Sequence, residues 1–312
     1  MWEFDTGVYP GTWNEVESPV NTPLYDVVTT QNGPAAVGAK GYVIGRNPGG
    51  EWGVLVENGP TRRGDVLRAI DATDDGKRVW FTGDGGSIGF YDLETGERKD
   101  YTNTEKLSGT IGAVTVAGTR GSEKLLFADS SGNVLPAYTK GSTPTAALDW
   151  EYPSRPGGDT AVKAITSDTA GVGYAVDNNA RVYTTTADEG WEQIGIHDVG
   201  KSMYSAYVDG EVVLIGGGGG FVYEREGDDR WTPHNVGGFT VRALARQNGA
   251  MLAGGAGNLV YRDGNSRWGR VPWSAGTSVR GITFGSDWQA DVAVCKNGAI
   301  LEGHRDDGTR EP

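Results

Sequence analysis

One position in the chain is repeatedly basic, although the protein as a whole is acidic. Seven short segments of alternating polarity are spread along the sequence, and each begins with an apolar residue. The residues that follow this first apolar residue are Tyr25, Arg68, Gly112, Lys163, Tyr204, Arg242 and Arg280. Four of them are basic, whereas the chain has 41 acidic and 28 basic residues and a net charge of −13. Guanidinium and ammonium groups brought to one place can bind carboxylates and other anions.

Other kinds of chemistry have little support in the sequence. His197, His234 and His304 show no metal-ligand spacing, and Cys295 is the single cysteine. The acidic turn at 71–75 lacks the regular spacing of a calcium loop, and no carboxylate pair is marked for glycoside hydrolysis. We therefore predict no catalytic residue, no metal site, no disulfide within the chain and no cofactor.

The seven segments belong to a longer repeat. Each is followed by a hairpin pattern: a small apolar run, Gly or Asp, two turn residues, Gly, any residue, and then Val, Ile or Leu. The plainest copy is 213–223, in which five consecutive glycines separate two β-rich runs and are explained by turn chemistry. The repeats are 37 to 48 residues apart, measured between the last apolar residues of the hairpins, at 43, 88, 134, 182, 222, 259 and 300.

An aromatic residue after most hairpins indicates a fourth strand in each unit. A polar turn is followed by Trp52, Trp150, Trp191, Trp231 and Trp268, while the second unit has Tyr101 instead. Four strands per unit with this period are typical of a β-propeller, in which periodic aromatic residues pack between the blades. We therefore predict an all-β, seven-bladed propeller with four-stranded antiparallel blades.

The two ends of the chain predict how the ring closes. The seventh unit ends without a tryptophan strand, and the missing piece occurs before the first unit, at about 11–17 around Trp13. The N-terminal strand should therefore complete the last blade and remove an open seam. We expect one domain over 1–312, with an extra loop at 138–156 in the longest unit. The blades should span roughly 20–57, 64–104, 109–154, 160–197, 202–235, 240–273 and 278–303.

The Gly-X-X-Gly-X-Val hairpins and the Gly-X-X-Trp turns resemble those of BNR-like propellers. That group includes the photosystem II assembly factor type and haloarchaeal propellers, and WD-type repeats share the architecture. The resemblance covers nearly the whole chain and implies an arginine-rich patch on one face. The best match to the family's Asp-box, 186–191, is two residues short, so the resemblance does not extend to sialidase chemistry.

The first strand of each propeller blade lies next to the central channel, so the repeated basic position predicts a ring at the channel mouth. We call the seven residues at this position the mouth ring, and its candidate binding residues are Arg68, Lys163, Arg242, Arg280, Tyr25 and Tyr204. Two interpretations remain open. The mouth ring binds an anionic group or an acidic peptide, or each cation pairs with a neighbouring carboxylate such as Asp26 or Asp71.

Two tryptophans out of phase with the repeat are further candidates. Trp273 and Trp288 lie in or near loops of the last two units and are expected at an interface if they are exposed.

Composition indicates the class of partner and the setting. An acidic surface disfavours nucleic acid and anionic membranes, and acidic, lysine-poor sequences are typical of halophilic archaea. No signal peptide and no transmembrane segment is evident, so a cytoplasmic or virion location is expected.

The leading hypothesis is a non-enzymatic, protein-binding scaffold propeller within a larger assembly, from a halophilic archaeon or its virus. The alternatives are a virion structural or host-attachment protein of a haloarchaeal tailed virus, and a glycan-acting hydrolase or lyase. The partner, a glycan ligand and the oligomeric state remain open.

Overall fold

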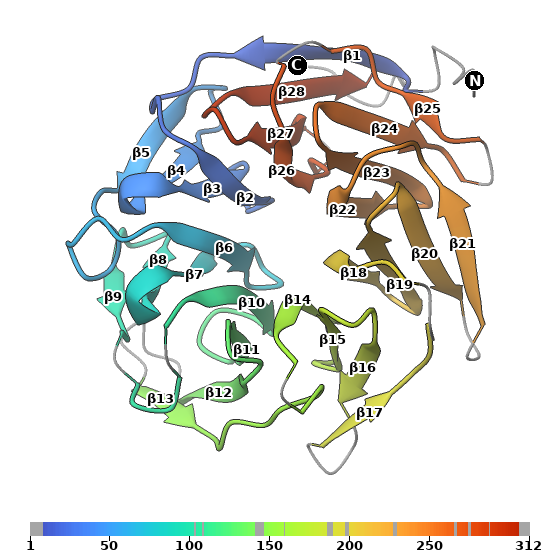
Figure 1. The fold of residues 1–312 in the computed structure, drawn as a ribbon. Helices are drawn as coiled ribbons and strands as arrows, with labels where there is room; N and C mark the ends of the chain where they lie inside the picture. The colour runs from blue at the N-terminus through green and yellow to red at the C-terminus, as the bar shows by residue number, and fades with distance from the viewer. Residues whose placement is uncertain are drawn as a thin grey trace.

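The protein is a ring of seven four-stranded antiparallel sheets arranged like the blades of a propeller (Figure 1). The computed structural model describes residues 9–305 except 103, 108, 141–146, 159, 186–189, 197–199, 227–229, 265–266, 274–275 and 287. Within this part of the chain no helix is long and apolar enough to span a bilayer. The predicted all-β, seven-bladed fold is confirmed.

Each blade runs outward from an inner strand beside the ring axis (Figure 1). The inner strands are β2 (Leu24–Val28), β6 (Leu67–Ala72), β10 (Ile111–Ala117), β14 (Val162–Ser167), β18 (Met203–Asp209), β22 (Val241–Gln247) and β26 (Val279–Thr283). The second strands are β3 (Ala35–Gly38), β7 (Arg78–Gly83), β11 (Lys124–Asp129), β15 (Gly173–Asp177), β19 (Val212–Gly217), β23 (Ala250–Gly255) and β27 (Asp291–Cys295). We number the blades 1 to 7 in this order.

The third strands are β4 (Val43–Arg46), β8 (Ile88–Asp92), β12 (Val134–Lys140), β16 (Val182–Thr185), β20 (Phe221–Glu226), β24 (Asn258–Arg262) and β28 (Ile300–Arg305). The outer strands are β5 (Trp52–Val56), β9 (Arg98–Asp100), β13 (Ala147–Trp150), β17 (Trp191–Gln193), β21 (Trp231–Asn235), β25 (Gly269–Arg270) and, in blade 7, β1 (Gly11–Val16). Two short 3-10 turns, η1 (Ala39–Gly41) and η2 (Asp84–Gly86), follow β3 and β7.

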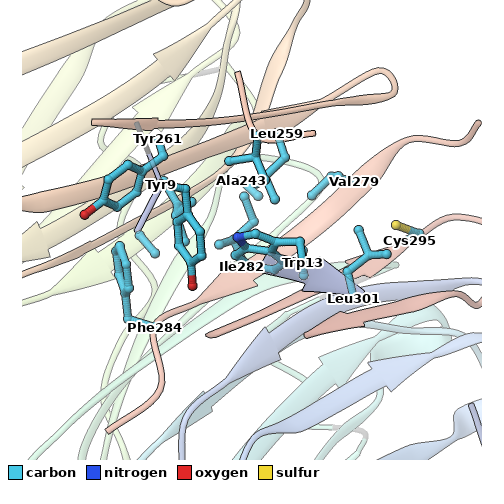
Figure 2. Packing of buried hydrophobic residues seen from close by; sticks show 14 of the residues in the cluster. Tyr9, Trp13, Ala243, Leu259, Tyr261, Val279, Ile282, Phe284, Cys295 and Leu301 are labelled. Atoms are coloured by element: carbon cyan, nitrogen blue, oxygen red, sulfur yellow. The ribbon is translucent and has the colours of Figure 1, made fainter. Parts of the chain in front are cut away.

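The N-terminal strand closes the ring as predicted. β1 pairs with β28 from Gly11↔Arg305 to Val16↔Ile300 and so completes blade 7. Tyr9 precedes β1, donates a 2.8 Å hydrogen bond to Asp291 Oδ2 and packs edge-on against Tyr261 of blade 6 (Figure 2). The N-terminal segment therefore holds together the seam between blades 6 and 7 as well as the outer edge of blade 7.

The repeat tryptophans link neighbouring blades at the outer strands. Trp52 Nε1 of blade 1 donates to Glu302 of blade 7 at 2.8 Å, and Trp231 Nε1 of blade 5 donates to the Ile194 carbonyl at 2.8 Å. Their rings pack against the buried residues between the sheets. The apolar faces thus fill the spaces between blades, and the indole N–H groups of Trp52 and Trp231 have acceptors, whereas Trp268 Nε1 is buried without one.

The third blade differs from the expectation. The predicted loop at 138–156 is wrong in two places, because β12 continues to Lys140 and the outer strand β13 occupies 147–150. Thr139 explains the longer strand: its hydroxyl donates to Glu123 Oε2 at 2.7 Å, and its N–H donates to the Glu123 carbonyl at 3.1 Å. Trp150 consequently ends its outer strand instead of starting it. The incomplete Asp-box lies largely outside the described residues.

Candidate functional site

A β-bulge places the mouth-ring residue in every blade. In all seven blades the pairing between the inner and second strands shifts register across this position, as in Leu67/Ala69 of blade 2 and Val241/Ala243 of blade 6. The mouth-ring residue is thus the extra residue of the bulge, which leaves it unpaired in the ladder and redirects its side chain. A shared sequence position therefore becomes a shared position in space.

The residue after each bulge is small in six of the blades because the inner strands crowd around the axis. A Cβ on Gly281 would come within 2.7 Å of the Val27 nitrogen in the next blade. The six residues are Ala69, Ala113, Ala164, Ser205, Ala243 and Gly281. In blade 1 the position is occupied by Asp26 instead.

The bulges surround one cavity of about 320 Å³. All seven mouth-ring residues line it, including the six predicted binding residues, and so do Asp26 and Thr110. Gly112 leaves part of the rim open, because a Cβ there would meet nothing within 4 Å. The structure therefore brings the predicted residues together around a single hollow; that they bind a ligand remains a prediction.

Two arginines of the mouth ring lie over tyrosines of the preceding blade. The Arg68 guanidinium carbon is 4.8 Å from the ring centre of Tyr25, and that of Arg242 is 4.9 Å from the ring centre of Tyr204. Cation–π contacts of this kind hold a guanidinium in a fixed plane and keep its N–H groups available. Blades 1 and 2 thus carry the same pair as blades 5 and 6.

Arg68 is already paired with an anion inside the protein. Its Nε and Nη2 donate to the two carboxylate oxygens of Asp84, at 3.0 and 2.7 Å, and Thr110 Oγ1 donates to Asp84 Oδ1 at 3.0 Å. The hydrogen bonds from Arg68 hold the pKa of Asp84 below its usual value, and the bond to Asp84 raises the pKa of Arg68. One of the four mouth-ring cations is therefore neutralised.

Asp26 and Asp71 do not pair with the mouth-ring cations, and to that extent the internal-pairing interpretation is wrong. Asp26 accepts the N–H groups of Val27 at 2.9 Å and Ile70 at 3.0 Å, while Asp71 accepts that of Val116 at 2.8 Å. Burial raises the pKa of Asp26 to about 7 and that of Asp71 to about 6. Both carboxyl groups bridge the inner strands of adjacent blades.

These two residues belong to a set of polar contacts across the blades, which we call the girdle. Thr29 and Thr283 join blades 1 and 7 through hydroxyls 2.8 Å apart, and the Tyr207 hydroxyl donates to the Arg246 carbonyl at 3.1 Å. The members of the girdle are Thr29, Asp26, Asp71, Thr115, Ser167, Tyr207, Gln247 and Thr283.

The remaining three cations lack an acidic partner. Among the residues that the structure describes, Lys163, Arg242 and Arg280 form no ion pair. Arg280 is the most confined, because its Nε is buried without a hydrogen-bond acceptor. Burial and the neighbouring charges of Arg242 and Arg68 lower its pKa. This side of the cavity therefore carries positive charge that the described part of the fold leaves unpaired.

The two interface tryptophans lie away from this cavity. Trp273 is half-buried and packs against the cluster around Tyr9 and Trp13. Trp288 is 47% exposed and lies between β26 and β27, at the end of β26 opposite the mouth ring. The sequence did not single out Tyr152, which is 85% exposed with the Lys106 ammonium 5.1 Å from its ring centre.

The described titratable residues form no other reactive constellation. No group of three or more His, Cys, Asp or Glu side chains within these ranges could hold a metal ion. His234 Nε2 lies 2.7 Å from Glu224 Oε2 and His304 lies near Glu302; neither histidine lines the cavity, and His197 is outside the described residues. Burial raises the pKa of the Cys295 thiol to about 12.

Sequence reasoning missed Asp84 and Thr110. Asp84 directly follows the Thr82-Gly83 of its hairpin, and Thr110 directly precedes the inner strand of the next blade. A comparison of the turn residues across the seven hairpins would have shown an acid at this point in one blade alone, which is the signal that could have found it.

Comparisons with known proteins support the architecture. No protein family model matches the chain, and no curated protein matches it. Virginiamycin B lyase from Staphylococcus aureus is 15% identical, with a TM-score of 0.73 over 93% of this chain and 98% of that one. YCF48 from Cyanidioschyzon merolae is 17% identical, with a TM-score of 0.72 over 95% and 99%. The WD40 propeller domain of Doa1 is 12% identical, with a TM-score of 0.73 over 98% and 100%. At these identities the likeness concerns the fold, which enzymes and other proteins share.

Proposed function

We propose that the protein is a non-enzymatic binding propeller that presents its channel mouth to an acidic segment of another protein within a larger assembly. One observation carries this proposal: Lys163, Arg242 and Arg280 line one cavity and have no ion-pair partner among the described residues. Arg242 and Arg280 are partly buried, and charge of this kind without a counter-charge is costly, so an anion from a partner would recover that free energy.

The charge distribution favours an anionic ligand that enters at one place. The body of the protein carries a net charge of −13 and repels acidic chains, whereas the cavity wall is basic. A basic hollow in an acidic surface concentrates the attractive field and steers the anion to it. The flanking Tyr25 and Tyr204 add aromatic surface on which the stem of an acidic side chain can rest.

The make-up of the cavity supports a binding role over the enzymatic alternative. A glycoside hydrolase uses two carboxyl groups at the scissile bond, but Asp26 is the single carboxyl group among the described residues that line the cavity. Asp26 is also engaged by two backbone N–H groups. Among the neighbours of the fold, a histidine-to-alanine variant of virginiamycin B lyase with quinupristin is described as catalytically inactive, whereas neither described histidine here lines the cavity.

We also propose the kind of organism and the location in which the protein acts. The acidic, lysine-poor composition supports a halophilic archaeon or its virus, with the protein in the cytoplasm or as a structural or attachment component of the virion. Its partner would be a protein or an acidic peptide, with a glycan as the alternative. An unfolding midpoint that rises with molar potassium chloride and detection of the chain in purified virus particles would support the two settings separately.

Peptide binding tests the proposal directly. The probe is a labelled Glu/Gly peptide, with a Lys/Gly peptide of equal length as the reference, measured by fluorescence anisotropy in dilute salt. In the variant Arg242→Ala/Arg280→Ala we expect affinity for the Glu/Gly peptide to fall at least ~10-fold, because the unpaired cations are removed.

The matched control removes two arginines elsewhere. Arg98 is the first residue of β9 and Arg230 directly precedes β21, so Arg98→Ala/Arg230→Ala makes the same change in charge on the outer strands. A folded Arg242→Ala/Arg280→Ala variant that binds as well as this control would contradict the proposed function.

A further inference from the structure

The arrangement around Arg68 shows how this propeller holds a carboxylate at its mouth. Four elements contribute: Tyr25 of blade 1 lies beneath the guanidinium, Arg68 of blade 2 donates two hydrogen bonds, Asp84 after β7 accepts them, and Thr110 before β10 donates a third. The carboxylate is therefore fixed between an arginine fork and a hydroxyl of the next blade. This is the strong, bidentate form of the ion pair.

Blades 5 to 7 repeat this arrangement with one member changed. Tyr204 lies beneath Arg242, as Tyr25 lies beneath Arg68. Ser278 directly precedes β26, as Thr110 directly precedes β10, so a hydroxyl is present at the same place in the next blade. With no acid beside it, the Ser278 hydroxyl donates to the Val279 carbonyl at 3.3 Å. The ring, the guanidinium and the hydroxyl are therefore all kept.

The changed member is the carboxylate. Leu67 pairs with Gly83, and the next residue is Asp84; Val241 pairs with Gly255, and the next residue is Ala256. Ala256 also forms a bridge with Ser278, which places its backbone beside that hydroxyl-bearing residue. Arg242 thus has the surroundings of Arg68, but a methyl group replaces the acid, and Ala256 is exposed.

The other turns show that the acid of blade 2 is an exception. The residues at the same point after the second strands are Ala39, Asp84, Ser130, Asn178, Gly218, Ala256 and Lys296. One of the seven is acidic, and the residue next to Ala256 in ring order, Lys296, is basic. Arg280 lines the same side of the cavity as Arg242. Arg242 therefore has positively charged neighbours, whereas Arg68 has the negatively charged Asp84 beside it.

We propose that Arg242 and Ser278 receive a carboxylate of the partner in the place that Asp84 occupies on Arg68. The inference rests on the proposed function and names the ligand group: an aspartate or glutamate side chain, or a C-terminal carboxylate. The ligand's two oxygens accept from the Arg242 guanidinium, and Tyr204 supports the guanidinium from below. The Ser278 hydroxyl turns from the Val279 carbonyl to donate to one of the ligand's oxygens.

Two reciprocal substitutions test this site. Ala256→Asp supplies the missing carboxylate from within and should lower the affinity for the Glu/Gly peptide at least ~10-fold, because Arg242 is then already paired. Asp84→Ala releases Arg68 and should raise the number of bound peptides from one to two in isothermal titration calorimetry. Ala39→Asp is the control, since it adds the same charge at the same turn position in blade 1, where the mouth-ring residue is Tyr25.

Two peptides separate the sources of the carboxylate. One has an internal glutamate and an amidated C-terminus, and the other has neutral side chains and a free C-terminus; the peptide that Ala256→Asp excludes identifies the source. Binding by Ala256→Asp equal to that of Ala39→Asp, with both variants folded by circular dichroism, would overturn the inference. If Arg242→Ala/Arg280→Ala still abolished binding in that case, the proposed function would stand and this site assignment alone would fail; if it did not, both would fail.

Discussion

Two groups of arginines in this propeller differ in where their counter-charges come from. Between blades 2 and 3, Arg78 is fully buried and lies 3.2 Å from Asp92 Oδ2 and 2.7 Å from Glu123 Oε1, while Arg120 also reaches Asp92 at 2.6 Å. We call these four residues the paired cluster. In the mouth ring, Arg242 and Arg280 have no carboxylate among the described residues.

The carboxyl groups show the same contrast in their pKa values. Burial works against ionisation of Asp92, yet hydrogen bonds from Thr95 and Arg78 hold its pKa below the usual value. No described cation pairs with Asp26 or Asp71 of the girdle, and burial raises their pKa to about 7 and about 6. An arginine whose carboxylate partners lie within the fold, as in the paired cluster, contributes to stability. An arginine at the cavity without such a partner is available to bind a carboxylate of another protein.

The largest effect is expected in the paired cluster. Arg78→Ala leaves Asp92 and Glu123 buried without their guanidinium, so the free energy of unfolding should fall by ~3–5 kcal/mol. Chemical denaturation measures the loss, and the fraction that remains folded should bind the Glu/Gly peptide normally. If Arg78→Ala lowered the free energy of unfolding by less than Arg280→Ala does, the distinction between the two groups of arginines would fail.

The girdle should make stability depend on pH. The pKa values of Asp26 and Asp71 are raised from an ordinary value of 3.8, so both carboxyl groups favour the folded state when protonated. Their contribution is complete below about pH 4 and is lost as pH rises through 6 to 7, at ~1.4 kcal/mol for each unit of pKa shift.

Asp26→Asn should flatten this dependence between pH 4 and pH 8, because the replacement does not titrate. Urea denaturation at several pH values provides the measurement. Parallel curves for the wild type and the variant would show that Asp26 has an ordinary pKa in the folded protein.

A single arginine of the mouth ring should matter for binding and hardly at all for folding. Arg280→Ala removes a partly buried guanidinium that repels Arg242 and has no acceptor for its Nε. The free energy of unfolding should change by less than ~0.5 kcal/mol, while affinity for the Glu/Gly peptide should fall several-fold. Destabilisation of the size expected for Arg78→Ala would mean that Arg280 is a structural residue.

The smallest effect on binding is expected for a neutral contact of the girdle. Thr29→Val removes the 2.8 Å contact with the Thr283 hydroxyl and the hydrogen bond that the Thr29 hydroxyl donates to the Phe284 carbonyl, while keeping the shape of the side chain. The free energy of unfolding should fall by ~1–2 kcal/mol, because one hydrogen bond usually contributes ~1 kcal/mol, with no change in peptide affinity. A change in affinity with unchanged stability would show that the girdle takes part in binding.

The fold and the position of the mouth ring could be predicted because both follow from periodicity. A four-strand unit repeated seven times determines the architecture, and a residue at a constant place in each unit must occupy a constant place around the axis. The unmatched Trp13 segment likewise identified the strand that closes the ring.

The charge partners could not be predicted because they depend on register. Asp71 is three residues from Arg68 in the sequence, but it lies further along the inner strand and away from the channel mouth. Asp71 therefore accepts the N–H of Val116 and does not pair with Arg68. Asp84 is 16 residues away, yet the pairing of Leu67 with Gly83 brings it to the same end of the blade. Proximity in sequence therefore indicated the wrong carboxylate.

The most direct test of the central claim measures binding and stability on one variant. For Arg242→Ala/Arg280→Ala the account predicts that affinity for the Glu/Gly peptide falls at least ~10-fold while the free energy of unfolding stays equal to that of the wild type or rises. A variant that unfolds more easily and binds the peptide as tightly as the wild type would contradict the claim that these cations are reserved for a partner.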